Sequence, residues 1–280
     1  MKTSWFLVSL ASFTTLLAAD GGSLNALSPN TASALGQGYA QMYDRQFETA
    51  HKIFVDLEHT RPEDPLVPTS DAAAYLFGEF DRLHILQAEF FVHEDKLVNG
   101  VKLTPDPAVR RVFDQTLRKA QSAADHALQS NPQDRNALFA SVLIMGLRSD
   151  FDALIDKHYF SSLTAMKSGR ITAEKLLMID PTYYDAHLAV GVENYMLSLK
   201  AAPVRWFLQV AGAQTDREQG IERLRLTAEK GNYLQPFARL LLAVAALRAQ
   251  DPAQARMLLE GLARQFPHNP IYAEELARLR

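Results

Sequence analysis

Hydrophobic side chains recur along this chain at intervals of three and four residues, which is the spacing of one face of an α-helix. The clearest case is a pair of segments with one apolar face each: Leu188, Val192, Tyr195 and Leu199, followed by Ile221, Leu224 and Ala228. Amphipathic helices of this length cannot bury their apolar faces alone, so they must stack on further helices. Since no alternating pattern extends beyond a few residues, the chain is predicted to be all-helical.

A second pattern groups the helical segments into pairs. Four prolines each follow a small residue by twelve positions, in the combinations Ala50 and Pro62, Ala120 and Pro132, Gly169 and Pro181, and Ala255 and Pro267. The small residue allows two helices to approach closely, and the proline ends the second helix. We therefore expect about five helix hairpins, over residues 28–59, 71–130, 135–179, 180–232 and 235–265, with a closing helix over 269–280. The second hairpin is expected to have helices over 71–92 and 106–130, and the second helix of the third to begin near Asp152. In the fourth hairpin, Thr215 and Glu218 predict a capping box at the start of the second helix, and Gly231-Asn232 predicts a left-handed turn at its end.

The connector inside the fourth hairpin, residues 201–213, is unusual because it is apolar. Repeats normally join their helices with a few polar residues, whereas this connector carries Trp206 and Phe207 beside Pro203. We expect it to fold back as a lid over the hairpin, since large aromatic side chains are usually buried. The alternative is an exposed docking patch, made by Trp206 and Phe207, for a partner or a membrane surface.

Composition narrows the range of functions. The chain has 280 residues, 48% of them apolar, and a formal net charge of −3, so nothing in it indicates nucleic-acid binding. The absence of cysteine excludes disulfides, thiolate metal sites and cysteine catalysis.

The first residues indicate export. Lys2 precedes an apolar run from Trp5 to Ala19, which is typical of a secretory signal peptide and too short to span a membrane comfortably. We expect residues 1–19 to be a signal peptide cleaved near Ala19, residues 20–27 a flexible mature N-terminus, and residues 28–280 the helical repeat domain. An uncleaved anchor is the alternative. An exported chain without cysteine fits the bacterial periplasm or the exterior.

Two groups of side chains could supply metal ligands: His84, His93, Glu94 and Asp95 in one, and Asp152, Asp156 and His158 in the other. The histidines of the first group do not align on a helix, and acidic residues at such spacings usually face solvent. The sequence contains no Gly-rich phosphate loop, nucleophile elbow or His-Glu-x-x-His zinc motif. We therefore predict no catalytic residue, metal or cofactor, and a protein that is not an enzyme.

The paired-helix pattern resembles that of tetratricopeptide-repeat proteins. From Asp180 to Pro270 the chain is similar to a bacterial, mostly exported family of them whose role is poorly defined. The similarity is carried by Asp180-Pro181, Asp185-Ala186 and Gly191, by Gly212, Asp216-Arg217-Glu218 and Gly220-Ile221, and by Ala255, Phe266-Pro267 and Asn269-Pro270. A eukaryotic family linked to mitochondria and lipid droplets has a similar Gly to Asp-Arg-Glu-x-Gly segment. The resemblance implies a right-handed superhelical array that binds proteins through its concave face; it implies no reaction.

The repeat frame also indicates which side chains would line that concave face. They are Tyr39, Tyr43, Asn136, Phe139, Asp185, Leu188, Tyr195 and Arg248. Aromatic residues with a few polar groups suit peptide recognition, although the tyrosines could equally pack between helices. We expect a scaffold or adaptor for a protein partner, with neither nucleic acid nor membrane contact expected. The alternative is a carrier for a lipid or other small apolar ligand in the same groove.

Overall fold

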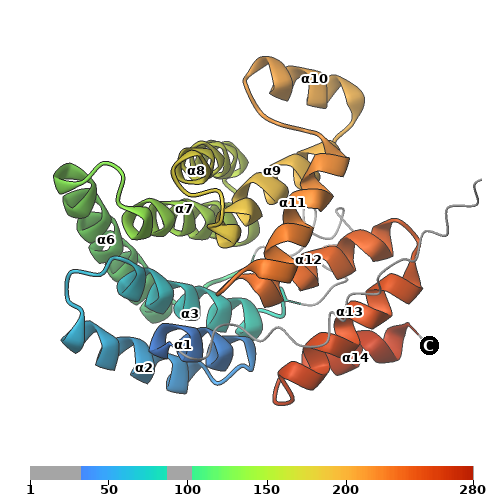
Figure 1. Ribbon diagram of the computed structural model, residues 1–280. Coiled ribbons are helices and arrows are strands. Elements are labelled where there is room, and N and C mark those ends of the chain that lie inside the picture. The colour runs from blue at the N-terminus through green and yellow to red at the C-terminus, as the bar shows by residue number, and fades with distance from the viewer. Residues whose placement is uncertain (1–32, 87–102, 280) are drawn as a thin grey trace, which may run out of the picture.

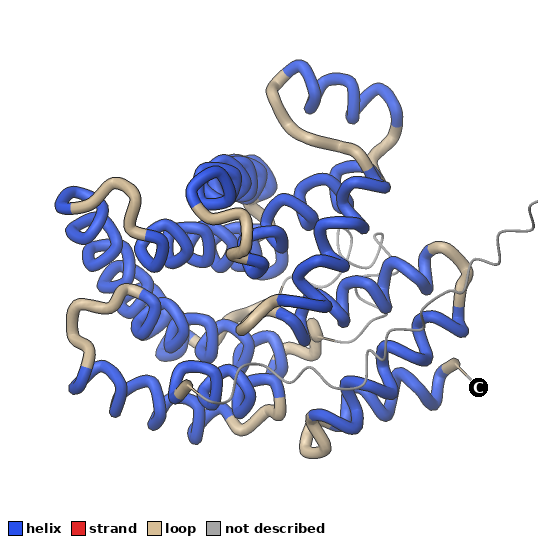
Figure 2. Tube along the Cα trace, in the orientation of Figure 1, coloured by secondary structure: helices blue, strands red, loops and turns tan. Residues whose placement is uncertain are grey.

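The computed structural model describes residues 33–86 and 103–279, and these residues confirm the all-helical prediction. They form twelve α-helices, a π-helical segment and a short 3-10 helix, and no strand occurs among them (Figure 2). The predicted signal peptide, the predicted flexible N-terminus and most of the link between the helices of the second hairpin lie outside the described residues.

Ten of the helices pair as antiparallel hairpins, each packed on the next along the chain. The pairs, in chain order, are α1 (Ala34–Tyr43) with α2 (Phe47–Thr60), α3 (Leu66–Arg82) with α6 (Pro107–Ser130), α7 (Arg135–Asp150) with α8 (Tyr159–Ile179), α9 (His187–Ser198) with α11 (Arg217–Lys230), and α12 (Gln235–Arg248) with α13 (Pro252–Gln265). Three connecting segments and the last helix complete the set: η1 (Phe151–Asp156), η2 (Tyr184–Ala186), α10 (Ala202–Val210) and α14 (Pro270–Arg278).

The four-proline pattern predicts the second helices of four hairpins correctly. Each of these helices ends two residues before its proline, for example α2 at Thr60 before Pro62 and α13 at Gln265 before Pro267. The small residues of the pattern are buried where the paired helices meet, and Ala50 and Ala255 have no exposed surface. The proline stops the helix because its ring cannot occupy a helix interior, and the small side chain sets the close packing.

Two helix boundaries differ from the sequence prediction. α3 covers Leu66–Arg82, whereas the apolar pattern predicted a helix from residue 71 to 92. α8 begins at Tyr159 rather than Asp152, because residues 151–156 continue α7 as the π-helical turn η1. Lys157 then takes a left-handed conformation, with φ of 59°, and reverses the chain into α8.

The ends of α11 also differ from expectation. Its N-cap is Asp216, whose side chain accepts a hydrogen bond from the backbone N of Gln219 at 3.0 Å, and not Thr215 in a capping box with Glu218. Gly231 does not adopt a left-handed turn, since its φ is −64°. A glycine fits there because a Cβ would lie 2.6 Å from the Thr227 carbonyl oxygen and 2.8 Å from Asp185 Oδ1.

The first and last parts of the described chain meet, so the stack of hairpins curves back on itself (Figure 1). The carboxylate of Asp44, just after α1, accepts hydrogen bonds from the backbone N and Nδ1 of His268, at 2.8 and 2.6 Å. Asn269 Nδ2 donates to the backbone oxygen of Tyr43 at 2.9 Å, and the Tyr43 and Phe266 rings lie 5.7 Å apart. These contacts join α1 to the turn between α13 and α14.

Candidate functional site

The side chains predicted to line an open concave groove are mostly buried inside the protein. Six of the eight are buried, namely Tyr39, Tyr43, Phe139, Asp185, Leu188 and Tyr195; Asn136 is exposed and Arg248 is half-buried. The ring of Tyr39 stacks on Tyr233 at 5.2 Å, and Phe139 contacts Tyr183 at 4.9 Å and Tyr233 at 6.5 Å. The prediction that these six line an open groove is therefore wrong. Around Tyr39 and Phe139, rings from separate hairpins fill the space.

Asp185 illustrates what such a residue does instead. Its carboxylate accepts hydrogen bonds from the backbone N of Asn232, Tyr233 and Leu234, at 2.9, 3.1 and 2.9 Å. Burial raises the pKa of Asp185, and the three backbone donors act in the opposite direction by favouring the charged carboxylate. This side chain fixes the turn between α11 and α12 and offers no free surface to a partner.

The segment that does present apolar side chains to solvent is α10, which stands away from the other helices (Figure 1). Pro203, Trp206, Phe207 and Val210 fall at helical positions i, i+3, i+4 and i+7, so they share one face. The exposed fractions are 67% for Trp206, 64% for Phe207 and 70% for Val210, and no residue of α10 is buried. The predicted lid is therefore wrong, and the connector forms an exposed apolar helix.

Polar side chains of α10 bind its stem, the two short segments over residues 199–201 and 211–216 that join α10 to α9 and α11. Arg205 Nη1 donates to the backbone oxygen of Lys200 at 2.8 Å, and Gln209 Nε2 donates to Thr215 Oγ1 at 2.6 Å. An ordinary surface helix has the opposite arrangement, with its apolar face on the core and its polar face in water. The inverted orientation leaves an apolar surface exposed, which in soluble proteins marks interaction sites.

A buried ion pair fixes the loop that follows α10. The carboxylate of Glu193, on α9, accepts hydrogen bonds from Arg170 Nε and from the backbone N of Gln214, both at 3.0 Å. Arg170 also donates to the backbone oxygen of Gly212 at 3.2 Å. Glu193 has no exposed surface and Arg170 is 6% exposed, so these charge-assisted bonds lie away from bulk water.

Further bonds hold both sides of the same loop. Asn194 Oδ1 accepts from the backbone N of Asp216 at 3.0 Å, and Lys167 Nζ donates to the backbone oxygen of Ala211 at 2.6 Å. Gly212 has a φ of 83°, a conformation that other residues rarely adopt. The exposed position of α10 is thus specified by polar contacts at its base. The sequence signal for this base is the polar pair Glu193-Asn194 within an apolar helix.

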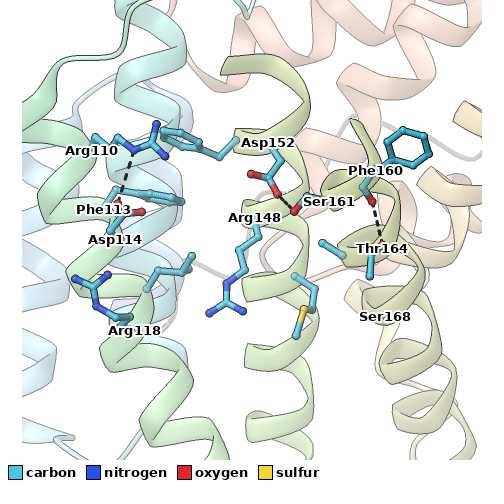
Figure 3. A pocket seen from close by; sticks show the side chains of 14 residues that line it. Arg110, Phe113, Asp114, Arg118, Arg148, Asp152, Phe160, Ser161, Thr164 and Ser168 are labelled. Atoms are coloured by element: carbon cyan, nitrogen blue, oxygen red, sulfur yellow. Dashed lines mark hydrogen bonds and ion pairs between the residues drawn. The ribbon is translucent and has the colours of Figure 1, made fainter. Parts of the chain in front are cut away.

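A second surface feature is a cavity of about 640 Å³ between α6, η1 with the end of α7, and the start of α8 (Figure 3). Its apolar wall includes Phe113 and Phe151, whose rings stack with centroids 5.1 Å apart and an interplanar angle of 13°. The guanidinium carbon of Arg110 lies 4.8 Å from the centre of the Phe151 ring. The sequence pattern gave no indication of this cavity, because its shape depends on how three successive helices pack, and a periodic pattern does not specify that.

Charged side chains surround the cavity, and they differ in whether they have a partner. Arg110 binds Asp156 through two parallel hydrogen bonds of 2.7 and 2.8 Å, which raise the pKa of Arg110. Asp152 accepts a hydrogen bond from the Ser161 hydroxyl. Arg118 and Arg148 also line the cavity, and the guanidinium of neither forms a hydrogen bond or ion pair with any residue that the structure describes.

The cavity borders one of the two groups of side chains that could supply metal ligands but that the sequence does not predict to bind a metal. Donor atoms of Asp152, Asp156 and His158 lie within 4.8 Å of one another. The guanidinium of Arg110 engages both carboxylate oxygens of Asp156, however, so the side chains as placed fit an ion pair better than a cation site. Of the other group, only His84 belongs to the described residues; positions 93–95 lie outside them.

In the part of the chain that the structure describes, no helix has both the length and the apolar character needed to cross a bilayer. No model of a known protein family matches the chain, and no curated protein shows significant similarity to it. The resemblance to exported tetratricopeptide-repeat proteins therefore stays a prediction from the residues that carry it, and function must be inferred from α10 and the cavity.

Proposed function

We propose that this protein is a non-enzymatic adaptor of the bacterial periplasm or exterior, built as a tetratricopeptide-like array, which binds a partner protein through α10. The observation that carries the proposal is the orientation of α10, whose apolar face points to solvent while its polar face is fastened to the stem. We place the partner site on this helix and not on the concave face, because aromatic side chains predicted to line that face pack against other rings of the protein.

The side chains of α10 favour a protein partner that offers a hydrophobic groove. Anchors at i, i+3, i+4 and i+7 are the pattern by which an amphipathic helix docks into such a groove. Trp206 is also of the residue type that contributes most often to the binding energy of protein interfaces. Aromatic side chains have few rotatable bonds, so holding Trp206 and Phe207 on a fixed helix reduces the entropy lost on binding.

A membrane surface fits these residues less well. Helices that lie on membranes usually present lysine and arginine on their polar face, where they meet anionic lipid head groups. The one cation of α10, Arg205, instead donates to backbone oxygens of Ser198 and Lys200. The whole chain carries a formal net charge of −3, which gives no general attraction to an anionic surface.

Differential capture from a bacterial envelope extract tests the proposal. The bait proteins are the wild type, the double variant Trp206→Ser/Phe207→Ser, and the control Met178→Ser. Met178 is a matched control because it is 79% exposed on α8 and does not belong to α10. The expected result is a protein captured by the wild type and the control but lost from the double variant.

A photo-crosslinking residue at position 210 then shows whether that protein touches α10 directly. Identical captured proteins for the wild type and the double variant would contradict the proposal. The membrane alternative predicts a different outcome, in which the wild type sediments with vesicles of phosphatidylethanolamine and phosphatidylglycerol and the double variant does not. That outcome would assign α10 to a lipid surface and overturn the adaptor function.

A further inference from the structure

We propose that the cavity between α6, η1 with the end of α7, and α8 is a binding site for a small organic anion with an apolar body. Arg118 and Arg148 carry the first part of the inference. They come from two different helices and line the same cavity, and Figure 3 shows both at the end away from Arg110 and Asp152. Neither guanidinium has a counter-ion among the described residues, so an oxyanion bound in this part of the cavity would supply the negative charge that the two arginines lack.

The remaining charges of the cavity do not compensate these two arginines. Its lining contains three arginines and two aspartates, Asp114 and Asp152. Arg110 is paired with Asp156 at 2.7 Å and lies 3.8 Å from Asp114, while Asp152 accepts the Ser161 hydroxyl. The two aspartates therefore have partners at one end of the cavity, and the arginines without a counter-ion, Arg118 and Arg148, lie at the other end.

The wall of the cavity defines the rest of the ligand. Phe113 and Phe151 form a stacked aromatic surface, and Leu117 and Met145 also line the cavity. A volume of about 640 Å³ lies within the range of about 300–1,000 Å³ that small-molecule sites occupy. Guanidinium groups bind carboxylate and phosphate oxygens through paired donors. The ligand class is thus an apolar chain or ring system with one carboxylate or phosphate group.

Titration calorimetry of the purified full chain with three probes tests the site. The probes are decanoate, decyl phosphate and decanol, which share a ten-carbon chain and differ in the charge of the head group. We expect at least one anion to bind with a stoichiometry of one, and decanol to bind at least about tenfold more weakly, since charged partners roughly double the strength of a hydrogen bond. The tighter of the two anions identifies the head group.

Arginine variants locate the binding. In Arg118→Gln/Arg148→Gln the dissociation constant of the better anion should rise at least about tenfold, since both of its charged donors are lost. The control Arg111→Gln changes the same residue type on the same helix outside the cavity, and it should leave affinity unchanged. Circular dichroism of each variant verifies that the fold is kept.

Three results would overturn the inference: no binding of either anion at millimolar concentration, equal binding of decanol, or unchanged affinity in the double arginine variant. The outcome is separable from the adaptor function, because Trp206→Ser/Phe207→Ser should bind the anion as well as the wild type. Loss of anion binding in that variant instead would place the ligand on α10 and refute the cavity site.

Discussion

At the scale of single residues, two glycines decide how closely α9 and α11 approach. A Cβ on Gly191 would lie 3.0 Å from the backbone oxygen of Gly220, and a Cβ on Gly220 would lie 2.6 Å from the backbone N of Tyr195. The second distance is shorter than real carbon contacts allow, and the atom it meets belongs to the backbone and cannot rotate away. These two positions fix the geometry of the hairpin that carries α10.

We predict that Gly220→Ala destabilises the protein by about 1–3 kcal/mol, which is the usual cost of forcing extra volume into a packed interface. The matched control is Gly261→Ala on α13, where a Cβ would have no neighbour within 4 Å. Alanine should stabilise the protein there by up to about 1 kcal/mol, through its higher helix propensity. Urea unfolding of the two variants measures both effects, and equal midpoints would show that α9 and α11 cross elsewhere.

A second residue, His187, makes stability depend on pH. Burial, and then the neighbouring Arg223 cation, lower the pKa of His187 from 6.5 to about 4. Arg223 Nη1 lies 3.2 Å from the imidazole Nδ1, so this nitrogen accepts a hydrogen bond and cannot take up a proton without losing it. In the unfolded chain the histidine is free to protonate.

The sign of the effect follows from the lowered pKa. Below pH 6.5 the unfolded chain binds a proton that the folded protein does not, so stability falls as the pH drops towards 4. We predict that urea midpoints measured at about pH 7 and about pH 5 differ less in His187→Gln than in the wild type. The exposed His126→Gln should behave as the wild type. A wild-type pH dependence kept in full by His187→Gln would contradict the assignment.

At the scale of elements, α10 and the rings around Phe139 show that aromatic side chains in one protein can serve opposite purposes. Phe139 has no exposed surface and contacts rings from two other segments, whereas Trp206 is 67% exposed on a helix without buried residues. Both lie in apolar stretches of the sequence, but only the first is part of the core. Truncating Phe139 should therefore lower stability, whereas truncating Trp206 should leave stability nearly unchanged and weaken only partner binding.

We predict that Trp206→Ala changes the free energy of unfolding by no more than about 0.5 kcal/mol, as surface substitutions do. Phe139→Ala should cost about 3–5 kcal/mol, because removing a buried aromatic ring leaves a cavity. Chemical unfolding followed by circular dichroism gives both values. A loss of several kcal/mol in Trp206→Ala would mean that α10 packs on the other helices in solution. That result would contradict the proposal that α10 binds a partner protein.

At the scale of the whole molecule, the contact between the first hairpin and the last turn makes the array a curved body whose ends meet. Asn269 has two roles in that contact, since its Nδ2 donates to the backbone oxygen of Tyr43 and its Oδ1 accepts from the backbone N of Ile271 at 3.1 Å. The first bond ties the two ends together, and the second caps α14. A repeat array whose hairpins touch only their neighbours would lack the first bond.

We predict that Asn269→Ala lowers stability by about 1–3 kcal/mol, because the Tyr43 carbonyl would stay buried without its donor. The control Asn131→Ala also removes an asparagine that accepts a backbone hydrogen bond, from Gln133, but at an exposed turn. Its effect should stay within about 0.5 kcal/mol. Comparable urea midpoints for the two variants would show that the ends of the array do not meet in solution.

The sequence by itself determined most of the helices and which of them pair as hairpins. Apolar spacing of three and four residues identifies a helix face wherever one side is buried, and a proline ends a helix by local sterics, as Pro62 and Pro267 do after α2 and α13. The closing helix and the fifth hairpin follow from the same rules. These features are local, so a stretch of about a dozen residues contains all the information they need.

Only the tertiary structure decided which apolar side chains are covered. Tyr39 meets Tyr233 across 194 positions of the sequence, and Asp44 meets His268 across 224, so no local pattern could place them in the core. Trp206 is exposed because bonds from Glu193 and Lys167 hold its loop outward, a result of packing between three separate segments. A side chain is buried only if other parts of the chain pack against it, so burial depends on residues distant in the sequence. The curvature of the stack of hairpins and the contact between its two ends likewise depend on all the hairpins together.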